Sequence, residues 1–170
     1  MPKILNEVLA ANTNYAASFG DKGKLPLPPA RHFAILTCMD ARLDVYRILG
    51  LNEGEAHVIR NAGGVVTDDE IRSLAISQRL LGTREIMLIH HTDCGLAKTT
   101  EDEFKGAIEA ETGIRPPWAV EAFTDAAGDV RQSIGRLKAS PFIPHKDQVR
   151  GFVYDVRSGS LQEVTRLAAA

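Results

Sequence analysis

Three short runs of strand type, separated by segments with helical patterns, constrain the fold of this chain more than any other feature. Residues 33–37 and 85–89 are continuous apolar runs, as expected of buried strands, and the shorter run 57–59 predicts a strand between them. Between the second and third runs, an amphipathic helix begins at Thr67 or Asp68 and ends at Gly82. This alternation of strand, helix and strand predicts an α/β fold, with a mainly parallel central β-sheet flanked by helices.

The two ends of the chain extend this central pattern. Residues 1–30 predict an N-terminal helix and a connector, and the helix either packs on a partner subunit or covers its own sheet. A further amphipathic helix is predicted over residues 125–138. Residues 149–156 and 161–164 favour a C-terminal edge strand or hairpin. With 170 residues in total, we expect a single domain, 1–170.

Charge and hydropathy exclude several classes of partner. The chain carries 20 basic and 22 acidic side chains, and no long run of like charge. We therefore expect no nucleic-acid partner and no membrane attachment, and a small neutral or anionic substrate fits better. The first ten residues show no apolar segment of the kind found in secretory signals, which predicts a cytoplasmic protein with reduced cysteines.

Soft metal ligands follow two of the predicted strands. Cys38 comes directly after the first strand, and His90, His91 and Cys94 come at the end of the third. Because ligands bind at the carboxyl ends of strands in open α/β sheets, we expect two thiolates and one imidazole to converge there. Such a set suits zinc and leaves one position open, as in catalytic sites. With two cysteines in the chain, the fourth ligand is water, a second histidine or a carboxylate, and Asp40 is the carboxylate nearest to Cys38 in sequence.

A carboxylate and a guanidinium lie beside the first cysteine. Asp40 and Arg42 are two residues apart, so in an extended loop their side chains point the same way and can pair. A carboxylate paired in this way stays ionised and can orient a zinc-bound water. The simpler interpretation is an ion pair that closes the loop.

Other polar residues near these loops have structural interpretations. Asp44 is expected to cap a short helix, and Asp93 to be solvated. The side chain of His90 should point to the opposite side of the strand from that of His91, as a packed or hydrogen-bonded histidine. Arg60 and Asn61 are expected to hold loops together.

The two motifs together resemble those of the β-class carbonic anhydrases. The pattern Cys-x-Asp-x-Arg is present at Cys38, Asp40 and Arg42, and His-x-x-Cys at His91 and Cys94. The Arg-Asn-Ala-Gly turn at residues 60–63 is similar to that family too. The resemblance runs from residue 33 to residue 95, and the pair of motifs is specific where either alone is weak.

The resemblance implies that Cys38, His91 and Cys94 bind one Zn²⁺ per chain and that Asp40 and Arg42 form the catalytic dyad. It also implies reversible hydration of carbon dioxide to bicarbonate by zinc-bound hydroxide. The expected assembly is a homo-oligomer, dimer or tetramer, with the active-site cleft at the subunit interface. In some members of the family the aspartate leaves its arginine and takes the fourth zinc position, which shuts the site.

Two other functions fit the same residues. The sequence of both motifs also resembles that of a branch that includes carbonyl sulfide hydrolases, which have the same zinc site but act on a different substrate. A non-catalytic protein, binding zinc or sensing redox state, would instead keep Asp40 permanently in the fourth position. That protein would lose zinc on Asp40→Asn, whereas an enzyme would mainly lose turnover.

Overall fold

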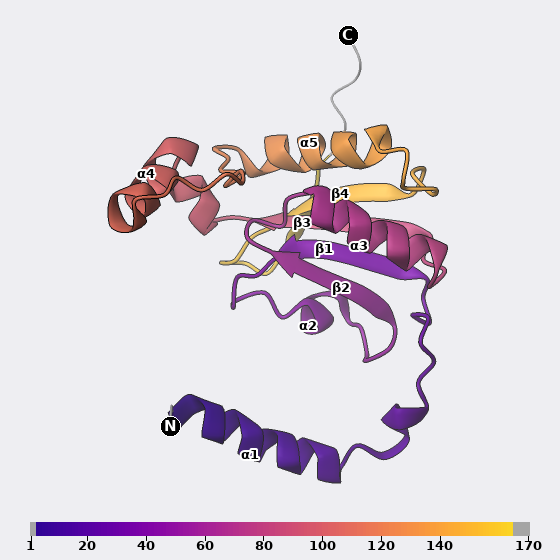
Figure 1. Cartoon of the computed structure of the whole chain (residues 1–170). Coiled ribbons are helices and arrows are strands. Elements are labelled where there is room, and N and C mark those ends of the chain that lie inside the picture. Colours follow the sequence, from indigo (N-terminus) through magenta and orange to yellow (C-terminus); the bar gives the residue numbers. More distant parts are fainter. Residues whose placement is uncertain (1–2, 165–170) are drawn as a thin grey trace.

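The computed structural model describes residues 3–164 and has the predicted α/β architecture (Figure 1). Its helices and strands are α1 (Lys3–Ala17), β1 (Phe33–Cys38), α2 (Val45–Leu49), β2 (Ala56–Asn61), α3 (Asp68–Arg79), β3 (Glu85–His91), α4 (Glu101–Thr112), α5 (Ala126–Ala139), β4 (Val149–Tyr154) and β5 (Leu161–Glu163). Two short 3-10 helices, η1 (Gly20–Lys24) and η2 (Gly95–Lys98), lie in connecting segments.

The central sheet has the strand order β2-β1-β3-β4-β5. Strands β1 to β4 pair in parallel, and β5 pairs antiparallel to β4, which confirms both the mainly parallel sheet and the C-terminal edge hairpin. From β1 the chain goes first to β2 and then returns past β1 to β3. The carboxyl ends of the adjacent strands β1 and β3 therefore form the switch point of the sheet, where open α/β folds bind ligands.

Helices cover the two faces of the sheet unequally. Ala34 and Leu36 of β1 pack with the inward residues of α3 and α5 on one face, whereas Ile35 packs with the short helix α2 on the other (Figure 1). This alternation follows from the two-residue period of a strand. Since β1 is buried on both faces, its apolar sequence is continuous.

Local capping sets the helix boundaries. The side chain of Asp44 accepts a hydrogen bond from the Arg47 amide and begins α2, as predicted, and Gly50 ends this helix in the left-handed region at φ 62°. Thr67 and Glu70 form a capping box at the start of α3. The helix predicted over residues 125–138 is α5, with Asp125 as its N-cap.

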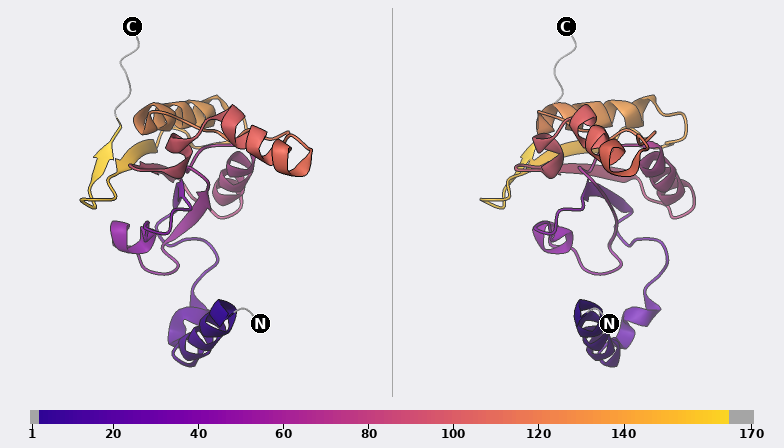
Figure 2. Two further views of the ribbon diagram at one scale, coloured as in Figure 1. Left: turned by 90° about the vertical axis from the view of Figure 1, so that its left-hand side faces the viewer. Right: turned by 60° about the vertical axis from the view of Figure 1, so that its left-hand side comes forward.

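Helix α1 stands away from the rest of the chain (Figure 2). None of its described residues is buried, and Ile4, Leu5, Val8 and Leu9 are 52–64% exposed. At the end of the helix, the Tyr15 hydroxyl donates to Glu53. The alternative that this helix covers its own sheet is therefore wrong. Within residues 3–164, no helix combines the length and the apolar character needed to cross a membrane.

Candidate metal centre

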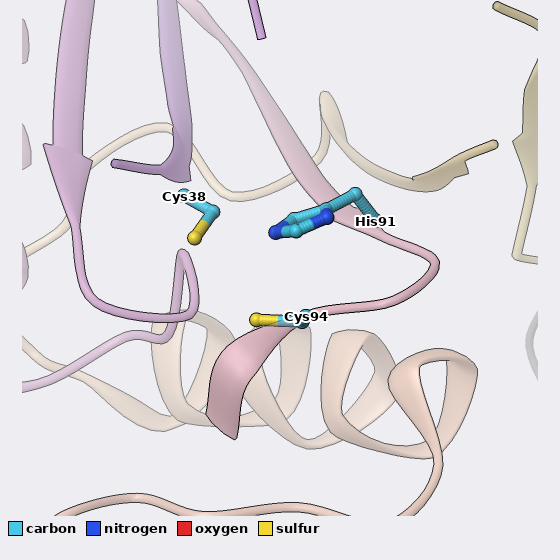
Figure 3. Close-up of side chains that lie close together, drawn as sticks. All are labelled: Cys38, His91 and Cys94. Atoms are coloured by element: carbon cyan, nitrogen blue, oxygen red, sulfur yellow. The ribbon is translucent and has the colours of Figure 1, made fainter. Parts of the chain in front are cut away.

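Three side chains converge at the switch point (Figure 3). Cys38 ends β1, His91 ends β3, and Cys94 immediately precedes η2. One ligand atom from each lies within 4.8 Å of the other two, and all three residues are buried. The loops after β1 and β3 are therefore neighbours, as the sequence predicted.

The imidazole of His91 is oriented as a metal ligand. Its Nδ1 lies 2.9 Å from the carbonyl oxygen of Thr92, so Nδ1 carries the proton and Nε2 has a free lone pair. Nε2 is buried and has no hydrogen-bond partner within the described part of the chain. A buried polar atom without a partner is costly unless something else binds it, and a metal ion would satisfy this nitrogen.

The two cysteines are free thiols that interact with each other. The interaction between the two thiols lowers the pKa of Cys38 and raises the pKa of Cys94, which burial raises further. Burial lowers the pKa of His91, but the proximity of Cys38, the Thr92 carbonyl and Asp40 outweighs burial, so the net pKa is raised. A soft cation would be favoured at such an electron-rich cluster.

Backbone contacts hold Cys38 in place. A Cβ atom on Gly64 would lie 2.9 Å from the Cys38 nitrogen, and Gly64 adopts φ +75°, so this position requires glycine. Arg60 donates to the carbonyl oxygens of Cys38 and Asp40 at 3.0 and 2.6 Å. The Asn61 amide donates to the Val65 carbonyl at 2.8 Å. Arg60 and Asn61 thus hold the loops together, as predicted.

The predicted pairing of Asp40 with Arg42 is confirmed. Arg42 Nε donates to Asp40 Oδ1 at 2.9 Å, and Arg42 Nη2 to Asp40 Oδ2 at 2.7 Å. These bonds from Arg42 hold the pKa of Asp40 well below its usual range, so the carboxyl is ionised at neutral pH. Asp40 Oδ2 also lies 3.9 Å from His91 Nε2. This carboxylate therefore borders the ligand cluster, which consists of Cys38, His91 and Cys94.

Asp93 is exposed to solvent, as expected, but both of its carboxylate oxygens are also paired with cations. Asp93 Oδ1 lies 2.5 Å from Lys98 Nζ, and Asp93 Oδ2 accepts from Arg42 Nη1 at 2.9 Å. The Lys98 ammonium and the Arg42 guanidinium together lower the pKa of Asp93 to about 2. Sequence reasoning did not find the ion pairs of Asp93 with Arg42 and Lys98, which form with the Asp93 backbone in the left-handed region at φ 57°.

His90 is the hydrogen-bonded histidine that its position predicted. Its ring is fully buried, and Nε2 lies 2.6 Å from Asp129 Oδ2 in α5, on the far side of β3 from the cluster. Phe123 packs against the same ring. The sequence pattern did not single out Asp129, although Asp129 lies one turn before the buried residue Ser133.

This fold and this group of candidate metal ligands are typical of one class of protein. The sequence profile described as "Carbonic anhydrase" matches residues 33–119, and the chain belongs to this family. It is 62% identical over 162 residues to beta-carbonic anhydrase 1 of Mycobacterium tuberculosis, which covers 95% of this chain and 98% of that protein. A crystal structure of carbonic anhydrase from Streptococcus mutans superposes with a TM-score of 0.91 at 43% identity, over 97% of this chain and 99% of that one.

A second group of relatives is more distant. The carbon disulfide hydrolase of Saccharolobus solfataricus is 35% identical, over 81% of this chain and 79% of that protein. The same fold and a related sequence are therefore found in hydrolases that are named for a sulfur-containing substrate.

Proposed function

We propose that this chain is a zinc-dependent carbonic anhydrase that hydrates carbon dioxide reversibly to bicarbonate. The observation that carries the proposal is the convergence of Cys38, His91 and Cys94, with ligand atoms within 4.8 Å of one another, beside the Asp40 and Arg42 pair. The 62% identity to a beta-carbonic anhydrase supports the same substrate.

The residues of the site have separable roles in this proposal. Cys38, His91 and Cys94 would hold the zinc ion. When bound, zinc supplies a Lewis acid that lowers the pKa of water to about 7. Asp40 is the ionised carboxylate next to the ligand cluster, and it would orient the attacking water. Arg42 fixes both oxygens of Asp40 and thereby sets the direction in which this carboxylate can accept a hydrogen bond.

Stopped-flow hydration of carbon dioxide by metal-quantified protein tests this function directly. We expect rapid hydration in proportion to zinc content, with one zinc per chain at full activity. Consumption of carbonyl sulfide and of carbon disulfide should be followed on the same sample. Slow hydration together with efficient release of hydrogen sulfide would contradict the carbonic anhydrase assignment and support the sulfide hydrolase.

The alternatives are less well supported. The relatives named for carbon disulfide share 35% identity or less with this chain, against 62% for the carbonic anhydrase. A permanently closed zinc-binding or redox-sensing protein needs Asp40 to contact the metal, whereas both Asp40 oxygens accept hydrogen bonds from Arg42. We also propose that the protein is cytoplasmic, because a reducing compartment keeps both cysteines available to bind zinc.

We also propose that the chain forms a homo-oligomer, dimer or tetramer. The apolar stripe of α1 is exposed within residues 3–164, and a folded protein seldom leaves such a stripe in water. A second exposed apolar surface is a groove of about 1350 Å³ between α3 and α5. Its apolar lining includes Ile76, Trp118 and Phe142. Association of copies would bury both surfaces.

Val8→Asp in α1 tests the assembly. An unpaired carboxylate buried at a subunit interface costs several kcal/mol, so the dissociation constant of the oligomer should rise by about 100-fold or more. Light scattering coupled to size exclusion should show the shift toward monomer. Asn6→Asp, which adds the same charge outside the apolar stripe, should leave the mass unchanged. An unchanged mass for Val8→Asp would contradict packing through α1.

A further inference from the structure

Arg42 contacts two carboxylates, and only one of them is Asp40. Besides its two bonds to Asp40, the guanidinium donates from Nη1 to Asp93 Oδ2 at 2.9 Å and from Nη2 to the Asp93 carbonyl oxygen at 3.0 Å. All three nitrogens of Arg42 are thus engaged, and the planar fork is held from both sides. A guanidinium that served only to pair with Asp40 would not need this second set of contacts.

The loop that supplies these contacts also carries two of the metal ligands. Asp93 lies between His91 and Cys94, and its backbone is in the left-handed region at φ 57°. This conformation is uncommon for a residue other than glycine, although aspartate tolerates it better than most. Asp93 Oδ1 is held in turn by Lys98 at 2.5 Å. Positive and negative groups therefore alternate in a series of ion pairs, from Lys98 through Asp93 and Arg42 to Asp40.

The Asp40 carboxylate has a second possible partner besides Arg42, which is a metal ion held by the neighbouring ligands. Arg60 donates to the carbonyl oxygen of Asp40 and restrains its backbone, whereas the Asp40 side chain is held by the amide and the guanidinium of Arg42. Asp40 Oδ2 is already 3.9 Å from His91 Nε2, and a carboxylate oxygen is a competent zinc ligand. Whether Asp40 stays with Arg42 or turns to the ligand cluster depends on how firmly Arg42 is held.

We propose that Asp93, supported by Lys98, is a positioning residue that holds Arg42 and so keeps Asp40 away from the metal. It acts through Arg42 and does not touch the substrate. The inference rests on the proposed roles of Asp40 and Arg42, and it assigns the open or closed state of the site to an ion-pair network anchored in the ligand loop.

Asp93→Asn in the full-length, metal-loaded protein tests the proposal. The amide keeps the shape of Asp93 but loses the charge that holds Arg42 and Lys98. Losing a hydrogen bond to a charged, partly exposed group should shift the equilibrium of Asp40 between Arg42 and the metal by about five- to tenfold. We expect the affinity of the Co²⁺-loaded protein for azide, followed by visible absorption, to fall by this factor, because azide needs the fourth metal position. In the zinc enzyme, kcat should fall in parallel with little change in KM.

Three comparisons separate positioning from a purely structural role. In an Asp40→Asn background, Asp93→Asn should leave azide affinity unchanged, since its effect passes through Asp40. Glu163→Gln breaks a bidentate pair with Arg150 at matched exposure, 42% for Glu163 against 44% for Asp93, and should change nothing. Lys98→Met should act in the same direction by about two- to threefold and provides the test if Asp93→Asn does not fold.

The proposal is overturned if Asp93→Asn binds azide as the unmodified protein does. Loss of metal from this variant would also overturn it, because Asp93 would then support the ligand loop itself. An unmodified protein that does not hydrate carbon dioxide would contradict the proposed function, yet the azide comparison would still decide the role of Asp93.

Discussion

Replacing His91 with glutamine is expected to empty the metal centre. Glutamine is close to histidine in size but lacks the imidazole nitrogen that zinc prefers, so two thiolates would remain as protein ligands. Removal of a group that only supports a metal ligand commonly weakens metal binding by about 10- to 100-fold, and loss of the ligand itself should exceed that range. Zinc content after dialysis, measured by mass spectrometry, should fall well below one per chain, and carbon dioxide hydration should fall with it.

His57→Gln is the matched control for this change. His57 lies in β2, outside the ligand cluster, and its Nδ1 lies 2.8 Å from the Ser77 hydroxyl, a contact that a glutamine side chain can replace. This variant should retain its zinc. Full retention of zinc by His91→Gln would show that the ligand set is wrong and would turn attention to the neighbouring His90.

Much of the fold could be predicted because its signals are local. The boundaries of α2 follow from Asp44 as a cap and Gly50 as a stop, and both residues act within their own turn. The site could be located for a related reason. Parallel strands place their carboxyl ends on one edge, so Cys38 and His91 become neighbours once β1 and β3 pair.

The missed features depend on contacts that no local pattern encodes. The bond between His90 and Asp129 requires α5 to pack on β3 with one particular rotation. The bond between Arg42 and Asp93 requires a left-handed residue inside the ligand loop. For α1, the apolar stripe predicted a helix but not the surface that covers it, because a stripe of this kind suits a partner subunit as well as its own sheet.

Asp40→Asn is expected to lower turnover by about 10²- to 10⁴-fold, the range typical of losing a positioned proton acceptor. The amide carries no negative charge beside the ligand cluster, and its NH₂ group cannot accept a hydrogen bond from Arg42. Because Arg42 keeps the pKa of Asp40 far below neutral, the unmodified carboxylate is ionised throughout the working range of pH. The loss should therefore be similar at pH 7 and pH 9 when each is compared with the unmodified protein.

The control for Asp40→Asn lies four residues away. Asp44→Asn is the same chemical change in the same loop, but Asp44 caps α2, and asparagine caps a helix as well as aspartate does. Turnover of Asp44→Asn should therefore match that of the unmodified protein. Zinc content decides between the two accounts of Asp40 itself. Retained zinc with lost turnover supports the catalytic dyad, whereas lost zinc would mean that Asp40 is the fourth ligand of a closed site, because only a direct ligand should be needed to hold the metal.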